Sequence, residues 1–266
     1  MLSPTATIAL ATILLGLQFC SSELYQRRLL GTPFEHTTDG SVQVDTLVLL
    51  DSSRNRPIPI AYYRPEGSDQ LNAKLVLISH GYGENKPGTY LHFSSLARNL
   101  AIHGYAVASI QHELPNDETL PMKGDLAALR RPNWERGVAN MEFVREALGR
   151  RYPSLHTDRI DVIGHSNGGD MAMLFAEMHP TRVGTAISLD NRRMPLPRVS
   201  QPRICSVRAN DAPADPGVLP TPEEQALFGI RIIDLPDTRH VDMDDRAPEK
   251  QRAVLNQLVL DLLAKK

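Results

Sequence analysis

The pentapeptide Gly-His-Ser-Asn-Gly at positions 164–168 constrains the fold of this chain more than any other stretch. Residues 159–163 before it are predicted to form a short buried strand, and residues 170–177 after it a helix. Glycines two positions before and after the serine leave no Cβ to clash where a strand turns directly into a helix. In this setting, G-x-S-x-G is typical of a nucleophile held on a sharp turn. We therefore predict that Ser166 is a nucleophile; the alternative is a plain glycine-rich turn in which the serine is incidental.

The length and composition of the chain indicate one globular domain. Its 266 residues suffice for a single α/β domain with one hydrophobic core. With 41% hydrophobic and 23% charged residues, the chain resembles folded proteins rather than disordered ones. The formal net charge is −2, so there is no basic excess to neutralise phosphates, and we expect no nucleic-acid partner.

The N-terminus carries an apolar stretch, residues 8–17, that has the length of a signal peptide and is short for a membrane span. Small residues follow at Ser21 and Ser22, where a cleavage site would lie. We therefore predict that residues 1–22 are a signal peptide or N-terminal hydrophobic segment and that residues 23–266 are a single domain. The expected location is exported, either periplasmic or secreted, with no stable membrane span in the mature chain.

Other interpretations of the N-terminus stay open. Cys20, with Leu17 three residues before it, would suit a lipoprotein, but Phe19 is large for a lipidation signal. The stretch also lacks positive residues before it, which leaves an uncleaved membrane anchor or a cytoplasmic start as alternatives. After cleavage past Cys20 only Cys205 would remain, so no internal disulfide is expected.

Strands and helices alternate along the rest of the chain, and the first two strands are expected to form a hairpin. The expected strands are 42–50, 58–63, 74–79, 105–110, 159–163, 183–189, 203–207 and 230–235, and the expected helices are 90–103, 133–149, 170–177, a short one from 221, and 247–263. Residues 112–132 are expected to be irregular and to form a rim or small cap over the site. The pattern predicts an α/β fold, a mostly parallel central sheet of about eight strands with helices on both faces.

A serine nucleophile needs a base, and His240 is the best placed of the nine histidines. It follows the last expected strand, five residues past Leu235, on a loop late in the chain. The others fall near the termini, on helices, in polar turns, inside the serine motif or in the expected rim. We predict that His240 takes the proton of Ser166 and returns it to the leaving group.

An aspartate that orients His240 should follow a strand between the serine and the histidine. Asp211, which follows the penultimate strand, is the favoured candidate, and Asp190, directly after residues 183–189, is the main alternative. Asp190 has arginines two and three positions later, so a simple ion pair also explains it. Asp215 is a third, weaker candidate.

The oxyanion formed during acyl transfer needs backbone N–H donors near the serine. One expected donor is Asn167, directly after the nucleophile. The other is Tyr82, in the His-Gly-Tyr-Gly segment 80–83 that follows the first core strand. An ordinary glycine turn is the alternative interpretation of that segment.

These residues together resemble the α/β-hydrolase family, and the resemblance covers almost all of residues 42–263. The order Ser166, Asp211, His240 is the order of that family, and segments 80–83 and 164–168 match its two most specific motifs. The resemblance implies the α/β-hydrolase fold and a Ser-His-Asp triad.

Within that family the chain is similar to dienelactone-hydrolase-like, polyester-hydrolase-like and platelet-activating-factor-acetylhydrolase-like members. Residues 51–60 resemble their opening hairpin, and Asn210-Asp211 with Ala214 resembles the acid loop of the polyester hydrolases. Residues 188–190 instead resemble the segment from which the acetylhydrolases take their acid. The chain departs from the dienelactone hydrolases proper by having serine rather than cysteine as nucleophile.

We therefore predict a serine hydrolase that cleaves carboxylic esters through an acyl-enzyme, with a small-molecule or lipid-like ester as substrate. No organic cofactor and no metal are expected. Asp242, Asp244 and Asp245 would suit a cation, but the solvated start of a helix explains them as well.

Two rival functions remain. The same site would also suit an amidase, a peptidase or an acyltransferase, because fold and triad do not determine the substrate. A non-catalytic binding protein with this fold is the other, which the presence of the serine, the histidine and both glycine turns disfavours.

Overall fold

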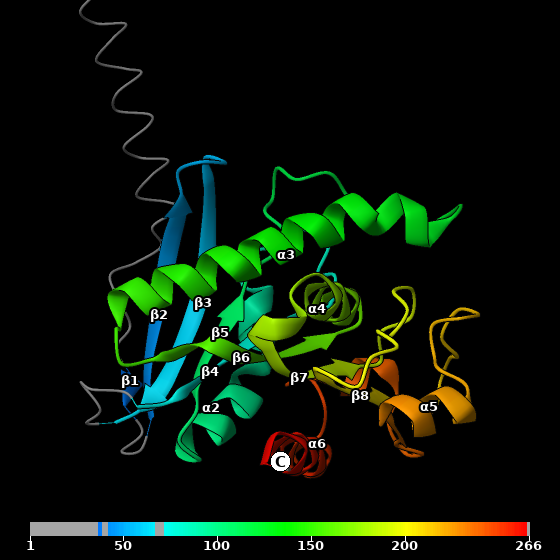
Figure 1. The fold of residues 1–266 in the computed structure, drawn as a ribbon. Coiled ribbons are helices and arrows are strands. Elements are labelled where there is room, and N and C mark those ends of the chain that lie inside the picture. The colour runs from blue at the N-terminus through cyan, green and yellow to red at the C-terminus, as the bar shows by residue number, and fades with distance from the viewer. Residues whose placement is uncertain (1–36, 39–41, 67–71, 265–266) are drawn as a thin grey trace, which may run out of the picture. The chain divides into compact units, whose positions relative to one another are not determined.

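A computed structural model describes residues 37–38, 42–66 and 72–264 (Figure 1). The predicted signal peptide, residues 1–22, and Cys20 lie outside the described residues, so cleavage and export stay predictions. In the described part, no helix is long and apolar enough to cross a membrane.

All described strands belong to one nine-stranded sheet in the order β1-β2-β3-β5-β4-β6-β7-β8-β9. Their bounds are β1 (Thr37–Thr38), β2 (Val42–Asp51), β3 (Arg56–Pro65), β4 (Lys74–Ser79), β5 (Ala106–Ile110), β6 (His156–His165), β7 (Val183–Leu189), β8 (Arg203–Arg208) and β9 (Arg231–Asp234). From β5 to β9 all neighbours are parallel, whereas β1, β2 and β3 pair antiparallel. The predicted mostly parallel sheet is confirmed, with the two-residue β1 added at its edge.

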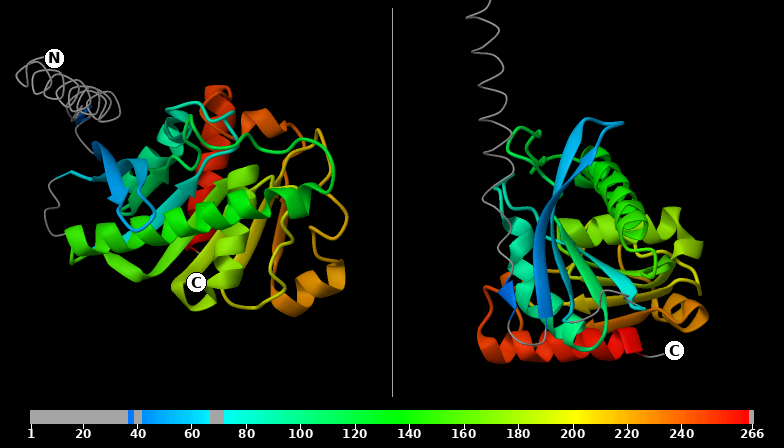
Figure 2. Two further views of the ribbon diagram at one scale, coloured as in Figure 1. Left: turned by 90° about the horizontal axis from the view of Figure 1, so that it is seen from above. Right: turned by 90° about the vertical axis from the view of Figure 1, so that its left-hand side faces the viewer.

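The parallel strands are almost wholly apolar because both of their faces are covered. The helices are α2 (Ser94–Ile102), α3 (Leu126–Arg151), α4 (Asn167–Met178), α5 (Pro222–Phe228) and α6 (Glu249–Ala264). Helices α3 and α4 cover one face of the sheet, and α2 and α6 cover the other (Figures 1 and 2). Each face has its own apolar core, which agrees with the predicted helices on both faces.

Local sequence signals account for several boundaries. Residues 51–56 form the predicted turn between β2 and β3, where Asn55 has a positive φ and the Asp51 carboxylate accepts the backbone N–H of Ser53. Helix α5 begins with the expected cap, in which Thr221 and Glu224 each accept the other's backbone N–H.

The helix expected over 133–149 is longer than predicted, which shortens the irregular stretch expected over 112–132. Helix α3 begins at Leu126 and passes through Pro132. The Asp125 side chain caps it by accepting the N–H of Ala128 at 3.2 Å, so the chain is helical before the proline. Pro132 costs one backbone hydrogen bond, and packing of Trp134 in the core holds the following turns in place.

Candidate active site

The nucleophile candidate Ser166 lies on the turn between β6 and α4, as predicted. Its backbone has φ 53° and ψ −122°, a conformation that L-residues rarely adopt. The Ser166 N–H donates to the carbonyl of Leu189 at 2.9 Å, which ties the turn to the end of β7. Backbone strain of this kind is typical of turns at functional sites, where the surrounding contacts hold the residue in an unfavourable conformation.

The two glycines of the motif are required by close backbone approach. A Cβ on Gly164 would overlap the carbonyl oxygen of Gly168, and a Cβ on Gly168 would overlap the carbonyl oxygen of Ser79. The second contact shows that the start of α4 lies against the end of β4. The glycine-rich pattern is therefore a packing requirement as well as a turn signal.

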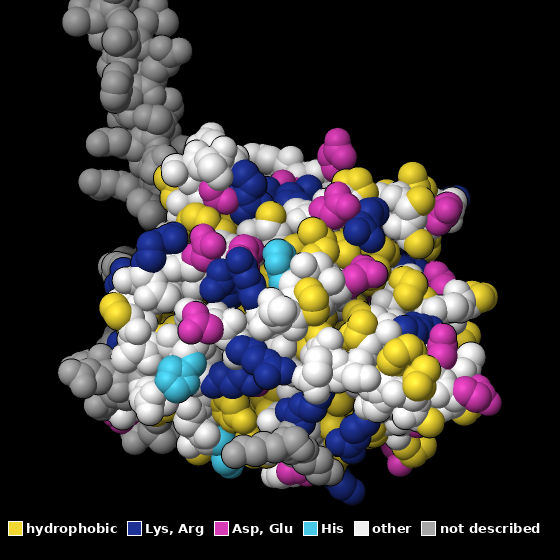
Figure 3. Space-filling view, viewed as in Figure 1, with side chains coloured by type: hydrophobic (Ala, Val, Ile, Leu, Met, Phe, Trp, Pro, Cys, Tyr) yellow, Lys and Arg dark blue, Asp and Glu magenta, His cyan; other side chains and the backbone are white. Residues whose placement is uncertain are grey.

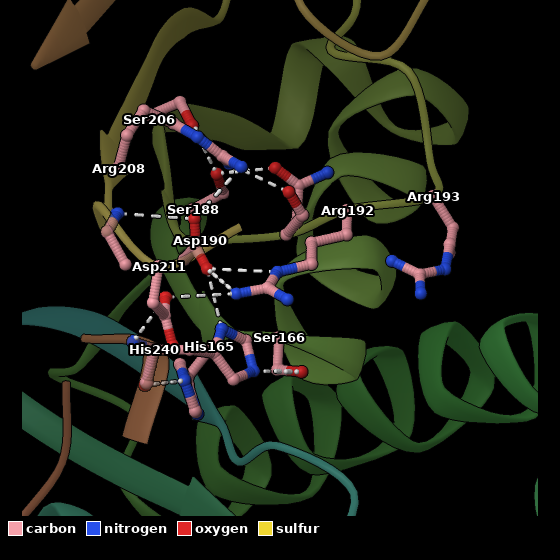
Figure 4. Close-up of polar contacts among 12 residues, drawn as sticks. His165, Ser166, Ser188, Asp190, Arg192, Arg193, Ser206, Arg208, Asp211 and His240 are labelled. Atoms are coloured by element: carbon pink, nitrogen blue, oxygen red, sulfur yellow. Dashed lines mark hydrogen bonds and ion pairs between the residues drawn. The ribbon is translucent and has the colours of Figure 1, made fainter. Parts of the chain in front are cut away.

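His240 lies beside Ser166. It begins the 3-10 helix η3 (His240–Asp242), and its Nε2 lies 2.9 Å from Ser166 Oγ (Figure 4). Just before it, the Thr238 N–H donates to the Leu235 carbonyl and the Thr238 carbonyl accepts the N–H of Asn210. The loop after β9 is thus held against the end of β8, and it carries the histidine to the serine turn.

The aspartate at the imidazole is Asp190, not the favoured Asp211. His240 Nδ1 lies 2.6 Å from Asp190 Oδ2. Asp211 accepts the backbone N–H of His240 at 3.0 Å instead, and its side chain is 38% exposed. The third candidate, Asp215, lies 3.4 Å from Arg193 as an ion pair.

Asp190 is fully buried and surrounded by donors. Arg192 Nη2 lies 2.8 Å from Oδ2, Arg208 Nη2 lies 2.9 Å from Oδ1, and the Ala209 N–H also donates to Oδ1. Burial alone would raise the pKa of this carboxyl, but the His240 hydrogen bond and the charges of Arg208 and Arg192 outweigh it and lower the pKa to about 2. Asp190 is therefore a permanent carboxylate at neutral pH.

Asp190 forms ion pairs with Arg192 and Arg208 and also contacts the imidazole of His240, two contacts that the sequence pattern did not indicate together. Asp190 has φ 55°, and its N–H donates to the carbonyl of Val207 on the neighbouring strand β8. The Asp190 carboxylate contacts the imidazole of His240. The signal available in the sequence was its place directly after a buried strand, without the two-residue spacer that separates Asp211 from β8.

The predicted oxyanion donors, Tyr82 and Asn167, lie near Ser166. Asn167 is the first residue of α4, where backbone N–H groups have no partner within the helix. Segment 80–83 follows β4, and a Cβ on Gly81 would lie 3.3 Å from the Cβ of Ser166. The structure thus brings Tyr82 and Asn167 to the serine turn, with both lining one cavity beside it.

The side chain of Asn167 is held by a buried polar network that sequence reasoning missed. Trp134 Nε1 donates to its Oδ1 at 2.8 Å, and its Nδ2 donates to Asn133 Oδ1 at 2.8 Å and Glu113 Oε1 at 3.3 Å. Trp134 and Glu113 are almost fully buried. The chain's single tryptophan, beside an asparagine in the predicted helix, was the one available signal.

The variable position of the motif, His165, also contacts the site. Its ring centroid lies 4.6 Å from that of His240, and its Nε2 lies 3.0 Å from the His240 carbonyl oxygen. Burial, with the neighbouring His240 as second cause, holds the pKa of His165 well below its ordinary value. A neutral His165 with its proton on Nε2 donates to the carbonyl oxygen of His240 and so helps to hold the backbone of that residue in place.

No protein-family model matches the sequence, and no curated protein matches it. Solved structures do match. A putative dienelactone hydrolase from Klebsiella pneumoniae is 14% identical, with a TM-score of 0.63, over 85% of this chain and all of that one. Esterase Est22 is 12% identical (TM-score 0.61; 85% and 82% covered), and an S-formylglutathione hydrolase from Agrobacterium tumefaciens is 14% identical (TM-score 0.59; 86% and 98% covered).

The chain has the α/β-hydrolase fold. The predicted resemblance is thereby confirmed at the level of architecture. In this α/β-hydrolase fold the serine turn follows β6 and the histidine loop follows β9. Strands far apart in the sequence therefore present Ser166 and His240 at the carboxyl ends of the parallel strands.

The cavity beside Ser166 has a volume of about 230 Å³. It is lined by Tyr82, Leu120, Met122, Arg130, Ser166, Asn167, Asp170, Arg192, Arg193 and His240. The N–H of Leu120 donates to the Tyr82 hydroxyl at 3.1 Å. Part of the segment expected to form a rim therefore lines the cavity that contains Ser166. A larger hollow of about 470 Å³ near Arg150 and His156 contains none of these residues.

The acidic run near the C-terminal helix is occupied by donors of the protein itself. Asp242 pairs with Arg239 at 2.7 Å, Asp244 with Arg246 at 2.6 Å, and Asp245 accepts the N–H of Ser95. Among the described residues no group of three or more His, Cys, Asp or Glu side chains has a metal-binding arrangement.

Proposed function

We propose that the protein is a serine hydrolase that cleaves carboxylic esters. The observation that carries this proposal is the continuous relay from Asp190 Oδ2 to His240 Nδ1 (2.6 Å) and from His240 Nε2 to Ser166 Oγ (2.9 Å). A serine hydroxyl with a base in hydrogen-bond contact, and a base oriented by a carboxylate, together form an activated nucleophile.

Catalysis would proceed through an acyl-enzyme. His240 Nε2 accepts the proton of Ser166 Oγ as that oxygen attacks the ester carbonyl, and the same nitrogen then protonates the leaving alcohol. The N–H groups of Tyr82 and Asn167 are the proposed donors to the oxyanion. Water then attacks the acyl group under the same base, which releases the acid and restores Ser166.

Asp190 would hold the imidazole with its proton on Nδ1, so that Nε2 is free to accept. A carboxylate with a pKa of about 2 does not take up that proton at neutral pH, and it stabilises the imidazolium as a charge. Arg192 and Arg208 fix its orientation. They also neutralise part of its charge, so orientation is the larger part of the role that we assign to Asp190.

The proposed preference for esters is supported by the solved structures that share this fold. The similar solved structures include proteins named as esterases and as hydrolases, and a cavity of about 230 Å³ suits a small acyl or alcohol group. At sequence identities of 12–14%, structural similarity supports a shared fold and not a shared substrate. The substrate must therefore be inferred from the residues of the site and tested by experiment.

Fluorophosphonate labelling and turnover of short-chain 4-nitrophenyl esters test the proposal on the full chain. We expect labelling of the wild type, loss of labelling and turnover in Ser166→Ala, and no turnover of matched peptidyl amides. A well-folded wild type that neither labels nor cleaves esters would contradict the proposal and favour a binding protein. Cleavage of amides at comparable rates would favour the amidase alternative.

A further inference from the structure

We propose that the substrate ester carries a carboxylate, which Arg130 and Arg193 bind inside the cavity beside Ser166. This inference rests on the proposed ester hydrolysis and adds the chemical class of its substrate. Three of the ten residues that line the cavity are arginines, and a guanidinium is the side chain best matched to a carboxylate.

Arg130 is the first observation. It lies near the start of α3 and is 8% exposed, yet no carboxylate of the described residues lies within ion-pair distance of it. Its Nε donates to the Pro121 carbonyl at 2.9 Å, and its Nη2 lies 3.4 Å from the sulfur of Met122. Buried charges are otherwise paired, so an unpaired guanidinium that lines a cavity indicates an anion supplied from outside.

Arg193 is the second observation. It follows Arg192 in the segment after β7 and lines the same cavity, and in Figure 4 its side chain lies apart from that of Arg192, which turns toward Asp190. Among the described residues, its ion pair is a 3.4 Å contact from Nε to Asp215, whose side chain is 48% exposed. Burial and the neighbouring Arg193 lower the pKa of Arg130, and the charges of Asp170 and Asp215 only partly offset them, so the two cations are close enough to repel each other. An anion between them would relieve that repulsion.

The acidic groups nearby do not cancel this field. Asp170, the one acidic residue that lines the cavity, accepts the N–H groups of Arg193 and Met194 and the amide of Asn191 on Oδ1. Burial raises the pKa of Asp170 to about 6, so its carboxyl is still mostly ionised at pH 7, but its Oδ1 is already occupied by these three donors. Asp190 and Asp211 are both engaged by Arg192 and His240.

The arginine lining is also unlike the outer surface. On the face that α3 covers, basic and acidic side chains are interspersed (Figure 3). The cavity of about 230 Å³, by contrast, is lined by the guanidinium groups of Arg130 and Arg193 together with Leu120, Met122 and Tyr82. A short apolar chain that ends in a carboxylate has the chemistry and the size for this space.

The test uses two esters that differ only in charge: mono-4-nitrophenyl glutarate and its neutral isostere 4-nitrophenyl 4-carbamoylbutanoate, both corrected for spontaneous hydrolysis. We expect the wild type to favour the carboxylate in kcat/KM by about 10-fold or more, because charge-assisted hydrogen bonds to a carboxylate exceed those to an amide.

Two variants and a matched control locate the effect. Arg130→Gln and Arg193→Gln should each lower the kcat/KM of the carboxylate ester by about 10-fold while changing that of the amide analogue less than about 3-fold. Arg131→Gln is the control, because Arg131 is the exposed neighbour of Arg130 and pairs with Glu135. Arg193→Gln carries the test if Arg130→Gln fails to fold, since Arg193 is partly exposed.

Two results would overturn the inference and leave the proposed function standing: equal turnover of both esters by a wild type that Ser166→Ala inactivates, or an undiminished carboxylate preference in Arg193→Gln. If neither ester is turned over, the proposed function fails instead. Calorimetry of glutarate and glutaramide with Ser166→Ala then decides the carboxylate site independently: binding of glutarate alone, abolished by adding Arg193→Gln, supports it, and no binding overturns it.

Discussion

The ends of β7 and β8 lie side by side in the sheet, and each is followed by an aspartate that the structure uses differently. Asp190 follows β7 directly, is fully buried, and contacts the imidazole of His240. Asp211 follows β8 after a two-residue spacer, is 38% exposed, and contacts the backbone N–H of the same histidine. One carboxylate orients a ring and the other anchors a loop, so position after a strand is not sufficient to assign the role.

The difference lies in what surrounds each carboxylate. Asp190 has two arginines, a histidine and a backbone N–H around it, which satisfy a charge that burial would otherwise make costly. The Asp211 side chain is partly exposed to solvent, and it lies 3.4 Å from Arg192, which also pairs with Asp190. Four predictions test whether this contrast holds.

The largest expected effect is on catalysis. Asp190→Asn should lower the kcat for a 4-nitrophenyl ester by about 10³- to 10⁴-fold, because the amide favours the wrong tautomer of His240. Asp211→Asn keeps an acceptor for the His240 N–H and should change kcat less than about 3-fold. Equal losses in the two variants would remove the distinction between the two aspartates, and circular dichroism checks that both are folded.

Removing a cation from Asp190 should have the next largest effect, on stability. Arg208→Met leaves a buried carboxylate with one partner fewer and should lower the free energy of unfolding by about 3 kcal/mol in urea titrations. Arg239→Met breaks the exposed pair with Asp242 and should cost less than about 1 kcal/mol. An Arg208→Met protein as stable as wild type would show that Asp190 does not depend on this ion pair.

The pH dependence of stability should reveal the charge of Asp190. The pKa of this carboxyl falls from its ordinary 3.8 to about 2 in the folded protein, so the folded state favours the carboxylate. Its contribution is present above pH 3.8 and is lost as the pH falls toward 2, by about 2 kcal/mol in total.

Urea unfolding of wild type and Asp190→Asn at several pH values between 5 and 2.5 measures this contribution. The stability advantage of wild type over Asp190→Asn should shrink as the pH falls. A constant difference between wild type and Asp190→Asn would show that the carboxylate of Asp190 has no lowered pKa.

The smallest expected effect concerns the anchoring of the histidine loop. Asp211→Ala removes the acceptor of the His240 N–H, one hydrogen bond on a partly exposed group worth about 1 kcal/mol. We expect kcat to fall about 3- to 10-fold, more than in Asp211→Asn. Identical kinetics of the two Asp211 variants would mean that this hydrogen bond does not position His240.

Much of the architecture could be predicted because it depends on local patterns. Apolar runs such as 74–79 match β4 residue for residue, and the serine turn, the short helix α5 and the opening hairpin follow from glycine, capping and turn signals. The start of α3 was missed because Pro132 was taken as a boundary, while the cap at Asp125 and the core packing of Trp134 keep the chain helical on both sides of it.

The sequence by itself determined the elements that meet at the site: a strand–serine–helix turn at Ser166, a histidine loop at His240 and a glycine loop at 80–83. These depend on residues close together in the chain, whose backbone preferences are read from composition and spacing. Only the tertiary structure decided which aspartate meets the imidazole and that Arg130 lines the cavity without a carboxylate partner. Those outcomes depend on contacts between distant segments, such as Asp190 and His240, which lie 50 positions apart, and they are set by how β7, β8 and α3 pack and not by any local preference.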